Sequence, residues 1–219
     1  CETPEIAYLL GILWADGYVE KKVFRITFSN LESDANAIES LVMKTGKWSV
    51  RAWQPSGKRK KQKGFTTSNK TIHQFLSNND YQSKSVSSAC KILNCIPEKL
   101  HCYFWRGYFD GDGCIHNRSR NGGHSSSMSL AGSFNQDWTF VEKCFENLNI
   151  QFKVQKRTYK QHKSSCVVIH NCNDINKFFK FIYPDNKYDG IGFERKYKKF
   201  IEMISNCSES KYQAVRNII

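Results

Sequence analysis

The chain has 219 residues, with 33 Lys or Arg against 20 Asp or Glu, so its formal charge is +13. This charge suits a polyanionic partner, although ribosomal, membrane-surface and heparin-binding proteins share it. No apolar run reaches the ~18 residues of a membrane span and no charged-then-apolar leader opens the chain, so we expect a soluble, intracellular protein of the cytoplasm, nucleoid or organelle matrix.

The first predicted element is a helix. Thr3 can cap it, Pro4 suits its first turn, and the apolar run 6–14 is long enough for about three turns. Gly17 is expected to be the left-handed residue that ends it. Asp16 then lies in the last turn, where the helix dipole is negative and carbonyl groups lack partners. A carboxylate there calls for a cation, and a hard divalent cation fits.

The rest of the first half predicts a sheet covered by helices. Residues 23–29 alternate between apolar and polar and predict a half-buried strand. A helix at 34–42, strands at 48–53 and 65–68 and a helix from 72 to 76 follow. The apolar side chains expected to pack on the helices are Phe24, Ile26 and Phe28, and those expected on the opposite face are Arg25, Thr27 and Ser29.

The second half repeats this order. Residues 9–18 return in chemical outline as 105–114, and the aspartates Asp16 and Asp112 are 96 positions apart. Strands are predicted at 114–116 and 127–133, joined by a Gly/Ser-rich loop, then a helix at 137–148, strands at 152–160 and 166–170, and helices at 175–182 and 193–204. Phe152 and Val154 are expected to face inward. The sequence thus predicts an α+β fold of two αββαββα repeats, 1–94 and 95–219, with an extra C-terminal helix.

Nine cysteines are scattered along the chain without a C-x-x-C pair. Zinc sites and disulfide frameworks need tighter spacing, so we expect reduced thiols that pack as small apolar groups.

The repeated segments 9–17 and 105–113 resemble the two motifs of single-chain LAGLIDADG homing endonucleases. The stretch from Ile96 to Gly107 and the pair Lys84 and Ser85 are similar to the lead-in to the second motif. The resemblance implies motif helices packed at a pseudo-twofold interface through Gly11 and Gly107, and two curved antiparallel sheets that form a DNA-binding saddle. It implies a monomer that makes a metal-dependent double-strand break in a long DNA target, as in intron or intein homing.

The resemblance also assigns roles to residues. Asp16 and Asp112 would bind Mg²⁺, with the carbonyl groups of Ala15 and Gly111 as further ligands; Mn²⁺ would substitute, and Ca²⁺ would bind without turnover. Basic residues near the metals would be Lys84 in the first half and Lys196, or else Arg195, in the second. The expected DNA contacts are Arg25, Thr27, Ser29, Arg51, Lys58, Arg59, Lys60, Lys61, Arg118, Arg120, Lys153, Gln155 and Arg157.

Two other functions are compatible with parts of the sequence. One is a catalytically silent descendant of the fold, acting as a DNA-binding regulator or an RNA-binding maturase; loss of a motif acid would favour it, and neither acid is lost. The other is a protein-splicing element, because His170, Asn171 and Cys172 resemble its end and Cys1 its start. However, Cys172 leads directly into a helix that the second repeat needs. Cys1 in place of Met indicates a fragment, a processed product or a domain embedded in a host protein.

Overall fold

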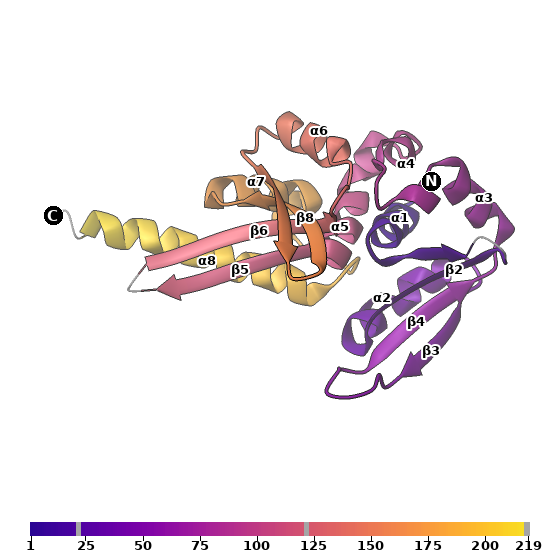
Figure 1. Cartoon of the computed structure of the whole chain (residues 1–219). Helices are drawn as coiled ribbons and strands as arrows, with labels where there is room; N and C mark the ends of the chain where they lie inside the picture. Colours follow the sequence, from indigo (N-terminus) through magenta and orange to yellow (C-terminus); the bar gives the residue numbers. More distant parts are fainter. Residues whose placement is uncertain (21–22, 121–122, 217–219) are drawn as a thin grey trace. The chain divides into compact units, whose positions relative to one another are not determined.

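The computed structural model describes residues 1–20, 23–120 and 123–216, with side chains described outside 118–125 and up to 206 (Figure 1). The chain forms two compact units. The first contains Cys1–Asp112 and Asp189–Phe193, and the second contains Gly113–Tyr188 and Glu194–Ile219. The units divide after Asp112 because the second motif helix packs with the first unit. The division of the sequence into repeats at 1–94 and 95–219 stays a prediction.

The first unit is an antiparallel sheet with helices on one face. Its strands run in the order β1-β2-β4-β3, and α2 contacts β2 and β4 (Figure 1). The elements are α1 Pro4–Asp16, β1 Tyr18–Glu20, β2 Arg25–Leu31, α2 Glu32–Lys44, β3 Ser49–Trp53, β4 Gln62–Thr67 and α3 Lys70–Asn78, then η1 Tyr81–Ser83, α4 Cys90–Asn94, η2 Glu98–Leu100 and α5 His101–Asp112.

The core of this sheet follows the predicted alternation. Ile26 and Phe28 are buried, and Phe28 stacks on Phe65 of the neighbouring strand. The expectation for Phe24 is wrong: it precedes β2, its ring meets His73 edge-on, and it stays 52% exposed. The reason is its position before the strand, where the pleat no longer directs the side chain into the core.

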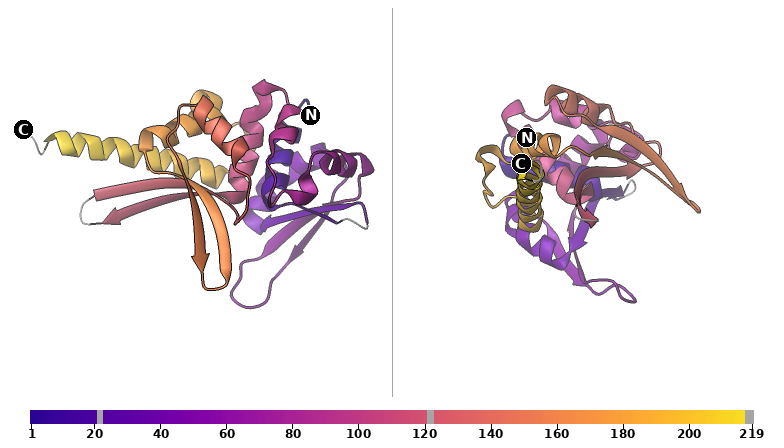
Figure 2. Two further views of the ribbon diagram at one scale, coloured as in Figure 1. Left: turned by 45° about the horizontal axis from the view of Figure 1, so that its top comes forward. Right: turned by 90° about the vertical axis from the view of Figure 1, so that its left-hand side faces the viewer.

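The second unit repeats the arrangement with the strand order β5-β6-β8-β7 (Figure 2). Both α7 and α8 contact β6. The elements are β5 Gly113–Arg120, β6 Gly123–Ser133, α6 Thr139–Asn147, β7 Lys153–Tyr159, β8 His162–Ile169, α7 Cys172–Ile182, η3 Pro184–Asn186 and α8 Glu194–Arg216. The fold is therefore α+β, with two four-stranded antiparallel sheets and eight α-helices in the described residues.

Two predictions for the second unit are wrong. The Gly/Ser-rich stretch expected as a loop continues the strands β5 and β6, because Gly and Ser there pair across the ladder from Asn117 to Arg120. Val154 lies on the same face as the buried Leu130 and Val167 but is 41% exposed, since β7 is an edge strand with a neighbour on one side only. Phe152 packs edge-on against Phe145 of α6, as expected.

The start of α1 matches the prediction and its end does not. The hydroxyl of Thr3 accepts a hydrogen bond from the Ile6 amide at 3.3 Å. Gly17 has φ −76° and ψ 155°, an extended and not a left-handed conformation. A Cβ atom at this position would lie 2.2 Å from the hydroxyl oxygen of Tyr81 and 2.6 Å from the carbonyl oxygen of Leu13. The glycine is therefore required because Tyr81 and Leu13 lie so close to it, and not because the backbone is left-handed.

The helices α1 and α5 cross in close contact within the first unit (Figure 1). A Cβ at Gly11 would lie 2.0 Å from the carbonyl oxygen of Phe104, and one at Gly107 would lie 2.2 Å from that of Tyr8. Residues 8 and 104, like 11 and 107, are related by the same 96-residue offset as the two motif acids. The contact is thus reciprocal, as expected for a pseudo-twofold helix pair.

The cysteines and Asn171 also bear on the sequence predictions. Cys172 is disulfide-bonded, which corrects the expectation of reduced thiols throughout, whereas burial raises the pKa of the free thiols of Cys102 and Cys144. Asn171 caps α7, since its side-chain oxygen accepts from the Asn173 amide at 2.8 Å. This capping role explains why an asparagine stands at position 171 without protein splicing.

No helix in the described part of the chain is long and apolar enough to cross a membrane.

Candidate active site

Both motif acids lie at the same end of the α1–α5 helix pair. Asp16 is the last residue of α1 and is exposed; Asp112 is the last residue of α5 and is partly exposed. A Cβ built on Gly111 would lie 2.3 Å from Cβ of Ala15 and 3.2 Å from Oδ2 of Asp16. The crossing therefore brings the ends of the two motif helices together. This close approach requires a glycine at position 15 or 111, and the chain has it at 111.

Lys84 supplies the cation that the end of α1 requires. Its Nζ donates hydrogen bonds to the carbonyl oxygens of Leu13 at 3.3 Å, Trp14 at 2.8 Å and Ala15 at 2.7 Å. Burial lowers the pKa of Lys84 from its usual 10.5 to about 8, although the carboxylates of Asp112 and Asp16 both act to raise it. One half-buried ammonium group thus caps the helix and lies within the electrostatic reach of both acids.

Two buried tyrosines lie within the electrostatic reach of the two acids. Burial, and then the carboxylate of Asp16, raises the pKa of Tyr81 above its usual range. Burial, and then the carboxylate of Asp112, does the same for Tyr108. The Tyr81 hydroxyl donates to the carbonyl oxygen of Leu13 and so helps to satisfy the end of α1.

Asn30, at the end of β2, orients the first acid and was not predicted. Its Nδ2 donates to Oδ2 of Asp16 at 2.9 Å, and the residue is 9% exposed. Its Oδ1 is buried and accepts no hydrogen bond from the described residues. The strand alternation could have placed Asn30 on the buried face with Ile26 and Phe28, where a polar side chain is unusual. In the second sheet, the register puts Gly132 at the equivalent position.

Lys196 is buried in the first turn of α8, 7% exposed, and donates from Nζ to the carbonyl oxygen of Gly113 at 2.8 Å. Gly113 directly follows Asp112 in the chain. The prediction named Arg195 as an alternative, and that residue is exposed.

The donor set fits a hard divalent cation. Among the described residues, no group of three or more His, Cys, Asp or Glu side chains could hold a metal ion. Two carboxylates and carbonyl oxygens leave most of the coordination shell to water and substrate phosphate, as Mg²⁺ commonly does. The buried, unpartnered Oδ1 of Asn30 is an acceptor suited to a cation-bound water. The carbonyl oxygen of Ala15 already accepts from Lys84 and has a second lone pair for a ligand.

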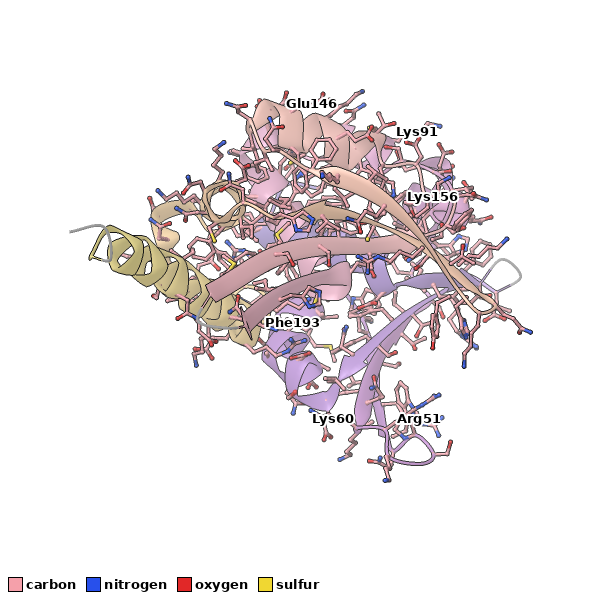
Figure 3. The ribbon with its side chains drawn as sticks, turned by 60° about the vertical axis from the view of Figure 1, so that its left-hand side comes forward. Arg51, Lys60, Lys91, Glu146, Lys156 and Phe193 are labelled. Carbon is pink, nitrogen blue, oxygen red and sulfur yellow. The ribbon has the colours of Figure 1, made fainter. Side chains whose placement is uncertain are left out.

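The outer face of the first sheet carries the residues expected there. Arg25 and Ser29 are exposed, Thr27 is half-buried, and the register places Arg51 of β3 opposite Gly64 on the same face. Arg25 pairs with Glu20 at 3.3 Å. Figure 3 shows Arg51 and Lys60 on the β3–β4 hairpin with their side chains directed outward. Lys58, Arg59 and Lys60 are exposed there, and Lys61 pairs with Glu32 at 2.8 Å.

The outer face of the second sheet has Lys153 and Arg157 exposed on β7, and Arg157 donates to Gln155 at 3.0 Å. Arg118 and Arg120 belong to β5, but their side chains lie outside the described part of the structure. Sequence reasoning missed polar and aromatic neighbours that the register adds to the first face, since these depend on strand pairing; among them are Tyr18, Trp53, Gln62 and Thr66.

Residues 99–183, which include the second motif, match the family of LAGLIDADG-like domains. This segment of the chain is therefore similar to LAGLIDADG-like domains. The matched segment runs from the turn before α5 to the end of α7 and covers the second acid but not the first. The curated proteins provide no match.

Solved structures show that the LAGLIDADG fold extends over the whole chain. The LAGLIDADG homing endonuclease I-GzeII in complex with its DNA target is 12% identical, with a TM-score of 0.64 over 98% of this chain and 92% of that chain. The homing endonuclease I-LtrWI bound to target DNA is 14% identical, with a TM-score of 0.58 over 94% and 91%. The N-terminal LAGLIDADG domain of DUF199/WhiA is 16% identical, with a TM-score of 0.55 over 86% and 85%. Identities this low establish the fold alone.

Lys84 makes the stability of the metal-free protein depend on pH. Its pKa is about 8 when folded and 10.5 when exposed, so the unfolded chain binds more protons between these values and stability rises with pH across this window. We expect the difference in unfolding free energy between wild type and Lys84→Met to shift in favour of wild type from pH 8 to 10.5. Urea unfolding in EDTA measures this difference, and a difference independent of pH would contradict the assignment.

Proposed function

We propose that the protein is a site-specific DNA endonuclease that makes a divalent-metal-dependent double-strand break, with Asp16 and Asp112 each serving one strand. The observation that carries the proposal is the meeting of both motif acids at one end of a reciprocal helix pair, beside the half-buried cation Lys84. Structural likeness to homing endonucleases bound to DNA supports it.

Each proposed residue has a task that follows from its contacts. Asp16 and Asp112, with the carbonyl groups of Ala15 and Gly111, would hold Mg²⁺. The bound cation would lower the pKa of a water molecule and neutralise the charge on the leaving 3′ oxygen. Asn30 holds the carboxylate of Asp16 in one orientation through its Nδ2. Lys84 keeps the end of α1 ordered without becoming a metal ligand itself.

Binding is assigned to the outer faces of both sheets. Arg25, Thr27 and Ser29 on the first and Lys153, Gln155 and Arg157 on the second would read base edges in the major groove of duplex DNA. The basic β3–β4 turn would contact phosphates. We propose that the chain acts as a monomer with internal pseudo-twofold symmetry; a host protein and an intron or intein context stay predictions.

The direct test is cleavage of a randomised DNA library with Mg²⁺, followed by sequencing of the cut ends. We expect one preferred long target. EDTA should abolish cleavage, Mn²⁺ should restore it, and Ca²⁺ should support binding without turnover because its looser, more numerous ligands do not suit the reaction. Cleavage that persists in chelator would contradict the mechanism.

Salt dependence should separate phosphate contacts from base contacts. Replacing Lys58 or Lys60 with Ala should weaken binding to all sequences equally and reduce the slope of log K against log salt by roughly one. Arg25→Ala and Arg157→Ala should each lose about 1–3 kcal/mol of discrimination at one or two base pairs. Lys143, exposed on α6, is the matched control. Uniform loss of affinity in the two arginine variants would rule out base reading by these faces.

A non-catalytic DNA-binding regulator is the second candidate, because the N-terminal domain of DUF199/WhiA has the same fold. The library experiment separates the two functions: specific binding without cleavage under Mg²⁺ or Mn²⁺ would favour the regulator.

A further inference from the structure

A short segment that follows the second sheet in the chain belongs to the first compact unit. We call residues Asp189–Phe193 the clasp. The guanidinium group of Arg106, which is fully buried in α5, donates to Oδ1 of Asp189 at 2.5 Å and to the carbonyl oxygen of Ile191 at 3.1 Å. The clasp is therefore fixed at its start to the middle of the second motif helix.

The end of the clasp is fixed by Asp110. This carboxylate is 2% exposed, and its Oδ2 accepts hydrogen bonds from the Tyr8 hydroxyl at 2.8 Å and the Phe193 amide at 2.7 Å. A buried carboxylate needs such donors, since burying its charge without them is strongly unfavourable. Gly192 makes the approach possible: its φ is +105°, and a Cβ there would lie 2.7 Å from the same Oδ2.

The anchored residue immediately precedes α8. Phe193 is followed by Glu194, the first residue of that helix, and Lys196 lies in its first turn. The bonds from Phe193 to Asp110 and from Lys196 to Gly113 each join residues 83 positions apart. The first bond is made by Asp110, two residues before Asp112, and the second by Gly113, one residue after it. Fixing Phe193 therefore limits where the Lys196 ammonium group can lie.

The first motif differs from the second at the position of this anchor. The position equivalent to Asp110 is Trp14, whose ring packs edge-on against Tyr81. In that half the cation is placed directly, by the three bonds from Lys84 to the end of α1.

We propose that Asp110 is a positioning residue for the second catalytic centre: through the clasp, its carboxylate holds the start of α8 so that Lys196 stays on the Gly113 carbonyl next to Asp112. The inference rests on the proposed function, in which Asp112 serves one DNA strand. Arg106 and Gly192 support the same arrangement, and the first centre does not depend on it.

The test compares two glycine variants of the full chain. Gly192→Ala places a methyl group against the Asp110 carboxylate. Gly190→Ala imposes similar backbone strain, at φ +85°, with nothing within 4 Å of the new atom. We expect Gly192→Ala alone to speed hydrogen exchange of the Phe193 amide by about tenfold or more and to abolish the ¹⁵N signal of the hydrogen-bonded Lys196 ammonium group. Unchanged exchange and an unchanged signal would overturn the proposal.

Cleavage provides the second measurement. The strand whose cleavage depends on Asp112 should be cut about 10–100-fold more slowly by Gly192→Ala, with the other strand and DNA affinity unaffected. If the clasp acts through Lys196, adding Gly192→Ala to Lys196→Met should cost nothing further. Additive losses, or equal losses on both strands, would reduce Asp110 to a structural role. If wild type cuts no DNA, the proposed function fails, whereas the exchange and ¹⁵N measurements still decide the clasp.

Discussion

Asp16→Asn and Asp112→Asn should each eliminate double-strand cleavage of a supercoiled target plasmid, slowing formation of linear product by about 10³-fold or more. Each variant replaces one oxygen ligand by an amide at the meeting point of α1 and α5 and removes its negative charge. Since one acid is assigned to each strand, we expect nicked circles to accumulate. DNA affinity should be unchanged or slightly higher, because the lost group repels phosphate.

The matched control is Asp80→Asn. Asp80 has φ +61°, a conformation that Asn adopts readily. It forms a surface ion pair with Lys91 and has no proposed role in catalysis. This variant should cleave both strands at the wild-type rate. If both motif variants also produced linear DNA at that rate, the catalytic assignment would be wrong.

The order of elements could be predicted from the sequence because hydrophobic period, capping residues and repetition all act locally. The Thr3 cap and the buried alternation of Ile26 and Phe28 are examples. The failures arise where tertiary neighbours decide. Val154 depends on β7 lying at a sheet edge, and Gly17 on the approach of the Tyr81 hydroxyl. Neither neighbour can be identified from a local window.

The candidate site divides in the same way. The two acids could be found because each is an unusual end to an apolar helix, and the need for a cation there follows from the helix dipole. That Lys84 meets this need across some 70 residues of sequence could be inferred only from family resemblance. Asn30 and the clasp were missed, since the first requires knowing that β2 ends beside Asp16 and the second joins residues 83 positions apart.

Gly11→Ala and Gly107→Ala should each destabilise the first unit by about 3 kcal/mol or more, at the upper end of overpacking costs. The added methyl groups would lie 2.0 Å from the Phe104 carbonyl oxygen and 2.2 Å from that of Tyr8, and backbone atoms inside a helix cannot turn aside as a side chain can. Urea unfolding measures the loss. Cleavage should fall as well, because the two motif ends would separate.

Gly64→Ala on β4 is the control for the added methyl group itself. Its nearest neighbour would be the Trp53 ring at 3.0 Å, and Trp53 is 38% exposed and able to move, so we expect a change within about 1 kcal/mol. Both motif substitutions force the same movement of α1 away from α5. The double variant should therefore cost clearly less than the sum of the single ones. Full additivity would mean that each methyl group is accommodated locally, and a loss below about 1 kcal/mol in either single variant would contradict the close crossing of the helices.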